Sequence, residues 1–201
     1  MTKCSFKSLV KSKVLGFWET TLRAEAKPKS SLEYFKPEFM SLARPHPLWT
    51  TCNNNSFEVN KAHVVANLMS GRYPTDWLCR NWSSDNPTGH CILCPGQDIP
   101  GTLEHMLVSC DALASKRAIL AEYFHEKTAE NHDLRILAND MMSSNPKTLV
   151  QFLLDPSVMP SVITAIHNNK FTLSEVFALT RTYCYAIHRR RLQLTGKFKM
   201  L

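Results

Sequence analysis

Four residues in the middle of the chain have the types and spacing of a metal site. The pattern C-x2-C-x10-H-x4-C is formed by Cys91, Cys94, His105 and Cys110. Zinc in proteins favours thiolate and imidazole ligands in a tetrahedron, and a C-x2-C pair on a tight turn directs two sulfur atoms to one point. A Pro-Gly dipeptide at residues 95–96 supplies a bend directly after the pair. The spacing predicts one structural zinc ion bound by these four side chains.

The second half of this pattern constrains the local backbone. His105 and Cys110 are five residues apart, and five residues advance about 140° around an α-helix, so the two side chains would not face one point. A helix that starts near Thr102 must therefore end or bend near Cys110, with Asp111 opening the next one.

Two other interpretations of these residues remain open. The three cysteines could be ordinary thiols beside a buried histidine. Alternatively, His90 could replace one ligand, although it has no partner in the second half of the pattern. The remaining cysteines are isolated, and we interpret them as packing residues; they are Cys4, Cys52, Cys79 and Cys184.

No catalytic motif accompanies the predicted metal site. Four protein ligands close a zinc site, whereas catalytic zinc keeps one position open for water. No histidine is followed two residues later by Glu, as a zinc deaminase requires, and His125-Glu126 lacks the second histidine of a zinc protease. P-loop, dinucleotide-binding and nucleophile-elbow patterns are also missing. We expect a protein that is not an enzyme and has no small-molecule substrate.

The composition favours helices around this site. Glycine occurs only 6 times, fewer than an all-β fold usually needs, while 44% hydrophobic residues can build a core. We expect a mainly α fold around a zinc knuckle, with one short β-hairpin near residues 90–102. The expected organisation is a basic N-terminal helix or arm over residues 1–30, a Pro-rich extended connector over 31–55, and a helical zinc-knuckle domain with a basic C-terminal helix over 56–201.

Several helix boundaries can be placed within this plan. Ser56 is the expected N-cap of a helix that Gly71 ends, and Thr75 is the expected cap of a short helix after it. Residues 172–175 read Thr-Leu-Ser-Glu, a capping box before a long apolar run. Further helices are expected near residues 112–127, 134–142 and 146–154, with another after residue 157.

The N-terminal helix carries an apolar stripe from Phe6 to Trp18, with lysines beside it. A stripe at helical spacing predicts packing against the core. The alternatives are a helix lying on nucleic acid or on a protein partner.

Charge is distributed unevenly along the chain. The net charge is +7, and it divides into +5 over residues 1–50, −4 over 51–169 and +6 over 170–201. Basic segments favour a polyanion such as RNA or DNA, because they neutralise phosphates and release counterions; solubility alone is the other explanation. The candidate phosphate contacts are Arg72, Arg80, Arg189, Arg190, Arg191, Lys197 and Lys199. Tyr73, Trp77 and Trp82 could stack on bases, although packing in the core is the expectation for the two tryptophans.

Membrane and secretion signals are missing from the sequence. No apolar run approaches the roughly 20 residues of a membrane span, and the first residues do not resemble a signal peptide. Seven cysteines, three of them in one short segment, suit a metal site in a reducing compartment better than a disulfide framework. We therefore expect an intracellular protein of the cytoplasm or nucleus that does not enter a membrane.

Two segments bear a family resemblance. Residues 68–76 read LMSGRYPTD, and residues 101–110 read GTLEHMLVSC before Arg117. They resemble the region after the polymerase in reverse transcriptases of LINE-like, non-LTR retrotransposons, which carries a Cys-Cys-His-Cys knuckle with a Thr-x-Glu-His core. The resemblance covers roughly residues 30–195 and is strongest at 65–120; residues 45–49 and 181–184 also look similar.

The resemblance implies a zinc-stabilised module that contacts template RNA or target DNA beside a polymerase, with Cys91, Cys94, His105 and Cys110 as ligands. This sequence departs from the family in lacking any adjacent Asp-Asp pair, so polymerase activity is not implied. Three functions remain open: a nucleic-acid-binding module, a module that docks on a polymerase or other protein, and an element fragment without function.

Overall fold

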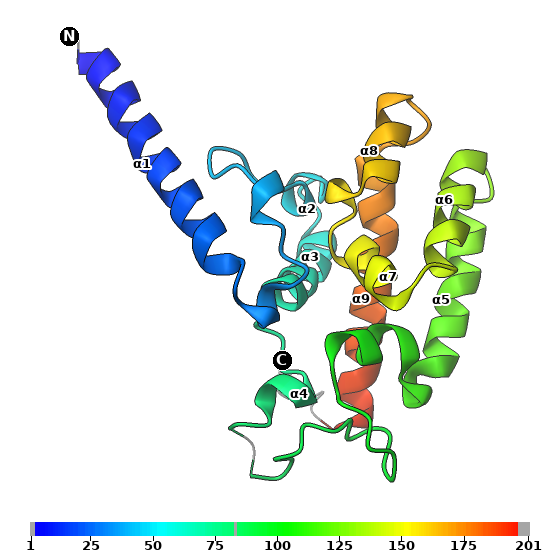
Figure 1. The fold of residues 1–201 in the computed structure, drawn as a ribbon. Coiled ribbons are helices and arrows are strands. Elements are labelled where there is room, and N and C mark those ends of the chain that lie inside the picture. Colours follow the sequence, from blue (N-terminus) through cyan, green and yellow to red (C-terminus); the bar gives the residue numbers. More distant parts are fainter. Residues whose placement is uncertain (1–2, 83, 197–201) are drawn as a thin grey trace.

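The computed structural model describes residues 3–82 and 84–196, and helices dominate it (Figure 1). The mainly α fold class is confirmed. The α-helices are α1 (Lys3–Ala26), α2 (Pro47–Thr50), α3 (Ser56–Met69), α4 (Asp76–Cys79), α5 (Ala114–Lys127), α6 (His132–Met142), α7 (Pro146–Leu154), α8 (Pro160–His167) and α9 (Leu173–Leu194). Short 3-10 turns are η1 (Ser30–Leu32), η2 (Pro37–Phe39), η4 (Asp111–Leu113) and η5 (Pro156–Val158), and η3 (His105–Ser109) is a π-helical turn.

Helix α9 is the element around which the core is built. It packs against α3, α5 and α7, and lies between α3 and α5 in Figure 1. Its inward side chains are almost fully buried, among them Phe177, Tyr183, Cys184 and Ile187. The predicted capping box is present at its start, where Thr172 and Glu175 satisfy each other's backbone N–H groups. Burial of this apolar face is the main source of stability for the helix.

The boundaries of α3 and α4 agree with the sequence except for one cap. The side chain of Asn55, not Ser56, accepts hydrogen bonds from the N–H groups of Phe57 and Glu58. Asn55 has the extended backbone that an N-cap requires, whereas Ser56 is already helical. Thr75 caps α4 as predicted by accepting from Leu78 N–H at 3.3 Å.

Gly71 ends the turn after α3 with a φ of +66°, a conformation that favours glycine. A Cβ at this position would lie 2.5 Å from the backbone oxygen of Ser31. The close approach holds the segment after α1 against the end of α3. The prediction that the helix ends at Gly71 is confirmed.

Residues 31–55 do not form the extended connector expected from their prolines. They contain η1, η2 and α2, and Tyr34, Leu48 and Cys52 are buried in the core. Pro47 occupies the first turn of α2, where its missing N–H costs nothing and its fixed φ suits a helix. Proline therefore starts a helix in this segment instead of interrupting one.

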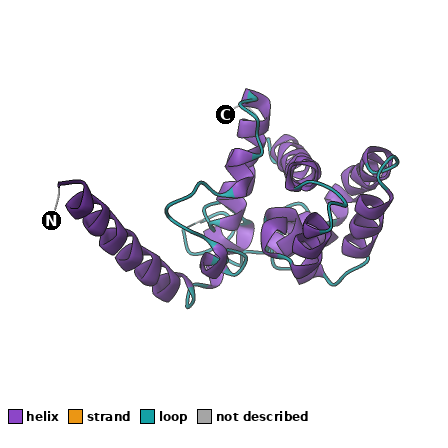
Figure 2. Cartoon of the chain, turned by 90° about the horizontal axis from the view of Figure 1, so that it is seen from above, coloured by secondary structure: helices purple, strands orange, loops and turns teal. Residues whose placement is uncertain are grey.

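Helix α1 projects away from the other helices (Figures 1 and 2). The expectation that its stripe packs on the core is wrong, because the large side chains on it are exposed: Phe6, Leu9, Val10, Val14, Phe17 and Trp18. Only its C-terminal part is held, with Ala26 buried and Arg23 Nε donating to Pro37 O at 3.4 Å. Helical spacing places apolar side chains on one face but does not supply a surface to cover that face.

The expected hairpin near residues 90–102 is reduced to a single antiparallel bridge between His90 and Pro100, and the described residues contain no strand. Two backbone bonds flank this bridge, from Cys91 N to Ile99 O and from Gly101 N to Gly89 O. Pro100 has no N–H to extend the ladder. Among the described residues, no helix combines the length and the apolar character that a membrane crossing requires.

Candidate metal centre

The four predicted ligands meet at one point in the interior. Cys91, Cys94, His105 and Cys110 are all buried, and one donor atom from each lies within 4.8 Å of the others. Cys110 Sγ is 3.9 Å from Cys91 Sγ and 3.6 Å from Cys94 Sγ. These distances exceed the roughly 2.05 Å of a disulfide bond, and all three cysteines are free. The group could hold one metal ion.

The first two ligands lie on a tight turn. Cys94 N–H donates to Cys91 O at 3.1 Å, and Gln97 N–H donates to Cys94 O at 3.3 Å. Gly96 has a φ of +79°, so the bend predicted after the pair uses a backbone conformation that glycine adopts without strain. The turn places both sulfur atoms on the same side of the loop.

A π-helical turn places the second two ligands. Cys110 N–H donates to His105 O at 2.7 Å, an i to i+5 bond that matches the five-residue spacing. Cys110 itself is extended, with φ −63° and ψ 117°, and η4 begins at Asp111. The prediction that the helix ends or bends near Cys110 is confirmed, and the wider turn is how the chain achieves it.

The imidazole of His105 is oriented from both ends. Its Nε2 lies 3.6 Å from Cys94 Sγ, and its Nδ1 lies 3.2 Å from Ser109 Oγ. A hydrogen bond to the far nitrogen commonly fixes the ring of a metal-binding histidine. The sequence analysis did not identify Ser109, although its position four residues after His105 on a helix was a usable signal.

Burial governs the ionisation of the cluster. Burial, followed by the neighbouring Cys91 thiol, raises the pKa of Cys110 to about 12, and burial also raises the pKa of Cys91. Burial and the charge of Arg117 lower the pKa of His105, which keeps the imidazole neutral and able to donate a lone pair. Adjacent buried thiols ionise together only when a cation compensates their charge, so the cluster is suited to a metal ion.

Neighbouring helices contact the segment that carries the four candidate ligands, residues 91–110. Tyr183 Oη of α9 donates to Leu107 O at 2.8 Å. Asp76 of α4 accepts from Ile92 N–H at 3.4 Å and pairs with Arg191 of α9 at 3.0 Å. The cavity that adjoins the cluster measures about 10 Å³, close to the space of one water molecule. These contacts connect the four ligands to α4 and α9.

Other candidate ligands lie outside the cluster. His90 Nδ1 is 3.5 Å from an exposed carboxylate oxygen of Asp98, and His90 is not part of the four-residue group. Cys52 and Cys184 are buried and donate their S–H groups to backbone oxygens, as expected of packing residues. Cys4 is exposed and Cys79 is half-buried, so neither fills the core.

The predicted phosphate contacts have different environments. Arg72 and Arg189 are exposed, and Arg190 is half-buried. Arg80 stacks 3.9 Å above the Trp77 ring. Arg191 is buried in its ion pair with Asp76, which corrects the prediction for this residue: its guanidinium links α9 to α4. Lys197 and Lys199 lie outside the described residues.

The expectation that Trp77 and Trp82 pack in the core is wrong. Trp77 is 39% exposed and Trp82 is 82% exposed. Trp77 lies on α4 and Trp82 follows that helix, which lies beyond the end of α3, where few elements are available to cover it (Figure 1). Their rings are therefore accessible.

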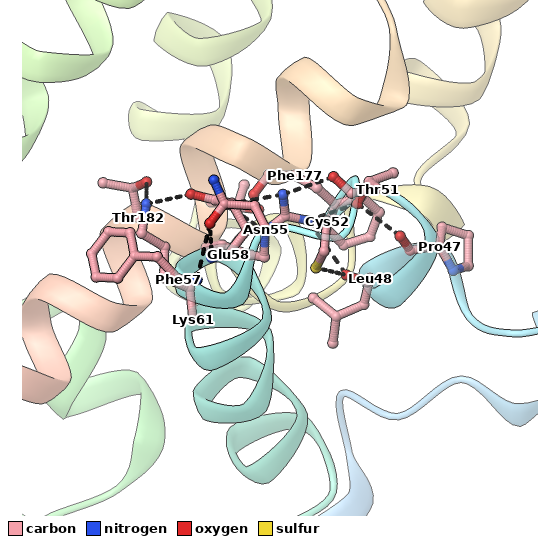
Figure 3. Close-up of polar contacts among 12 residues, drawn as sticks. Pro47, Leu48, Thr51, Cys52, Asn55, Phe57, Glu58, Lys61, Phe177 and Thr182 are labelled. Atoms are coloured by element: carbon pink, nitrogen blue, oxygen red, sulfur yellow. Dashed lines mark hydrogen bonds and ion pairs between the residues drawn. The ribbon is translucent and has the colours of Figure 1, made fainter.

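The sequence also gives no sign of a buried polar network centred on Arg181, whose partners Thr51 and Glu58 are labelled in Figure 3. The guanidinium is 1% exposed and donates to Glu58 Oε2 at 3.1 Å and to Thr51 Oγ1 at 2.6 Å. Lys61 Nζ donates to the other Glu58 oxygen and to Thr182. These residues join α3 and the end of α2 to α9. The contacts to α9 span more than 120 residues, so no spacing in the sequence reveals them.

Comparison with known proteins did not identify relatives: no family model matches the chain, and searches of curated proteins and of solved structures found no match.

Proposed function

We propose that this protein is a non-catalytic module that binds one structural zinc ion and contacts nucleic acid. The observation that carries the first part is the closed, buried cluster of Cys91, Cys94, His105 and Cys110. Four protein donors leave no open position of the kind that catalytic zinc keeps for water.

The spacing of the donor atoms supports zinc in particular. A tetrahedron with Zn–S bonds of about 2.3 Å and a Zn–N bond of about 2.05 Å has S–S edges of about 3.8 Å and S–N edges of about 3.6 Å. The sulfur atom of Cys110 lies 3.9 and 3.6 Å from its two neighbours, and Cys94 Sγ lies 3.6 Å from His105 Nε2. Soft thiolates exclude magnesium and calcium as preferred occupants.

Exposed cations and rings support the nucleic-acid part. Arg72, Arg189 and the Arg80–Trp77 stack are accessible to a ligand, and Trp82 is 82% exposed. Guanidinium groups bind phosphates with well-defined geometry, and indole rings stack on bases. The net charge of +7 adds a general attraction to polyanions.

Metal content and a salt series test the proposal. Native and denaturing mass spectrometry of the purified protein should show one zinc per chain, which His105→Ala should remove. Affinity for RNA or DNA should fall steeply as salt rises. A folded preparation never exposed to chelator that contains no metal would refute the zinc site, and equal affinity at low and high salt would refute binding through phosphates.

The exposed stripe of α1 favours a second function, docking on a protein. Phe17 and Trp18 are 64% and 55% exposed and contact each other edge to face. Exposed apolar patches often mark protein interfaces. Replacing Phe6, Phe17 and Trp18 by Ser should abolish binding to a protein partner with little change in its salt dependence, while metal content stays the same. Retained binding would exclude α1 as the interface.

We also propose, from the sequence resemblance alone, that the module derives from the tail of a LINE-like reverse transcriptase. In that setting it would bind template RNA or target DNA beside a polymerase. Sequencing the gene upstream of this chain tests the origin. A reading frame with a polymerase-type Asp-Asp pair supports it, and an unrelated upstream gene contradicts it.

A further inference from the structure

Two grooves of about 480 Å³ each flank one ridge of α9. The first lies between α3 and α9 and includes Asn60, His63, Asn67 and His188 in its lining. The second lies between α5 and α9 and includes Lys116, Arg190 and Gln193. Tyr185 and Arg189 line both grooves and so form the ridge between them. Neither groove contains a zinc ligand.

Helical periodicity explains why these side chains share one surface. On α3, residues 60, 63 and 67 are spaced by three and four positions, and all three are exposed. On α9, residues 185, 188, 189 and 192 follow the same spacing. The opposite face of α9 is the buried core face, so the core determines which side of α9 is accessible.

The grooves contain planar rings that could receive a base. Tyr185 contacts Phe57 at 5.7 Å and His188 at 6.3 Å between ring centroids, and Arg189 lies 5.9 Å over the Tyr185 ring. His63 is exposed and rests against Trp49 at 4.9 Å. Rings held by other rings keep their orientation, which lowers the entropy cost of stacking a ligand on them.

The charge of the two grooves has one sign. Their basic side chains are Arg189, Arg190 and Lys116, and no Asp or Glu is among the described residues that line either groove. A surface with cations and no carboxylates favours an anionic ligand. The amides of Asn60 and Asn67 add donors and acceptors suited to base edges.

His188 completes the first groove as a neutral hydrogen-bonding group. Burial, followed by the charges of Arg191 and Arg189, lowers its pKa. Its Nδ1 is 3.0 Å from Tyr73 Oη. A neutral imidazole can donate or accept a hydrogen bond at a base edge without repelling or attracting charge.

We infer that the two grooves beside the Tyr185–Arg189 ridge bind single-stranded nucleic acid, with a base against Tyr185 and the phosphates along Arg189, Arg190 and Lys116. This inference rests on the proposed function and specifies its surface. A single strand is favoured because only unstacked bases can enter a groove, and each volume is in the range of about 300–1,000 Å³ that accommodates a small molecule. A duplex presents phosphates but keeps its bases stacked inside.

Fluorescence anisotropy with the metal-loaded full chain tests the inference. The probes are labelled RNA and DNA strands of about 16 nucleotides, within the usual site sizes, and the matching DNA duplex. We expect either strand to bind more tightly than the duplex. Tyr185→Leu should weaken single-strand binding about five- to hundredfold with an unchanged salt slope, and Tyr185→Phe should restore it. Arg189→Gln should weaken binding and reduce the salt slope by about 0.7.

Matched controls separate these effects from general damage. Tyr123→Leu removes a similar ring on α5 that also lies beneath a cation, Lys127, and lines neither groove. Arg44→Gln removes an exposed charge elsewhere. Tyr123→Leu should leave single-strand binding unchanged, and Arg44→Gln should leave the affinity and the salt slope unchanged. If Tyr185→Leu lowers the melting temperature, His63→Ala at an exposed groove position provides the same test.

The outcomes distinguish failure of this inference from failure of the proposed function. Salt-dependent binding that Tyr185→Leu and His63→Ala leave unchanged overturns the groove while the nucleic-acid function stands. Tighter binding of the duplex also overturns it. If a folded, zinc-loaded chain binds none of the three probes, the proposed function fails and the groove assignment fails with it.

Discussion

The Cys/His cluster and the Arg181 network both gather polar side chains in the interior, but they are assembled differently. The cluster takes its four members from residues 91–110: one turn carries Cys91 and Cys94, and a π-helical turn with its C-cap carries His105 and Cys110. The network takes Glu58 from α3, Arg181 from α9 and Thr51 from the C-cap of α2, with sequence separations of 123 and 130 between the hydrogen-bonded pairs. One depends on local backbone geometry, and the other depends on the completed fold.

The difference shows in what each group can do. The sulfur atoms of the cluster contact one another and His105 Nε2, and such a set of buried thiols and imidazole could hold a cation. The Arg181 guanidinium is satisfied by protein atoms alone: a carboxylate, a hydroxyl and two backbone oxygens. The cluster could therefore bind a metal ion, whereas the network connects α2, α3 and α9.

Removal of the metal should have the largest effect. Structural zinc contributes about 10–16 kcal/mol of apparent binding free energy in small zinc-finger peptides, so His105→Ala should release the ion and loosen residues 85–120. Hydrogen exchange of these residues, measured with metal analysis, checks this. Ser109→Ala keeps all four ligands and loses only the contact to His105 Nδ1, and it should weaken metal affinity about 10- to 100-fold. Unchanged exchange in His105→Ala would mean that the loop is stable without a metal.

Breaking the Arg181 network should lower the free energy of unfolding by less than loss of the metal does, but it should affect α2, α3 and α9 together. Arg181→Met leaves Glu58 half-buried with only Lys61 as its cationic partner, and loss of one member of a buried pair costs about 3–5 kcal/mol. Urea unfolding measures the change, and metal content should stay at one ion per chain. The double variant with Glu58→Gln should recover part of the loss, because the uncompensated charge is gone. Fully additive losses would show that the two side chains do not interact.

The smallest effect should come from the ionisation of Glu58. Burial alone would raise its pKa, but the hydrogen bonds and charges of Lys61 and Arg181 lower it below its ordinary value. A carboxyl with a lowered pKa stabilises the fold above its unfolded pKa of about 4.3, and this contribution is lost as pH falls through the lower folded value. Glu58→Gln should therefore reduce the dependence of unfolding free energy on pH below about 4.3. If the unchanged protein and Glu58→Gln show the same pH profile, the ionisation of Glu58 does not contribute to the free energy of unfolding.

The four arginines of α9 show how far prediction from sequence extends. Arg181, Arg189, Arg190 and Arg191 belong to one helix whose capping box and length could be anticipated. Arg181 and Arg191 are buried in ion pairs, Arg189 is exposed on the ridge between the grooves, and Arg190 is half-buried. Helical spacing gives their relative directions. It does not show that Glu58 of α3 pairs with Arg181 and that Asp76 of α4 pairs with Arg191.

Short spacings determined what could be known from the sequence alone: most of the helices, the caps Thr75 and Thr172, the bend after Cys94 and the four candidate ligands. Bond geometry and local hydrogen bonds govern these features, since they involve residues within about one or two turns or one short loop. Only the tertiary structure decided that α1 stays exposed, that α2 forms in the proline-rich segment, and that α3 and α9 leave a groove between them. These features depend on which surfaces meet after distant segments pack, and the same local pattern is compatible with more than one such arrangement.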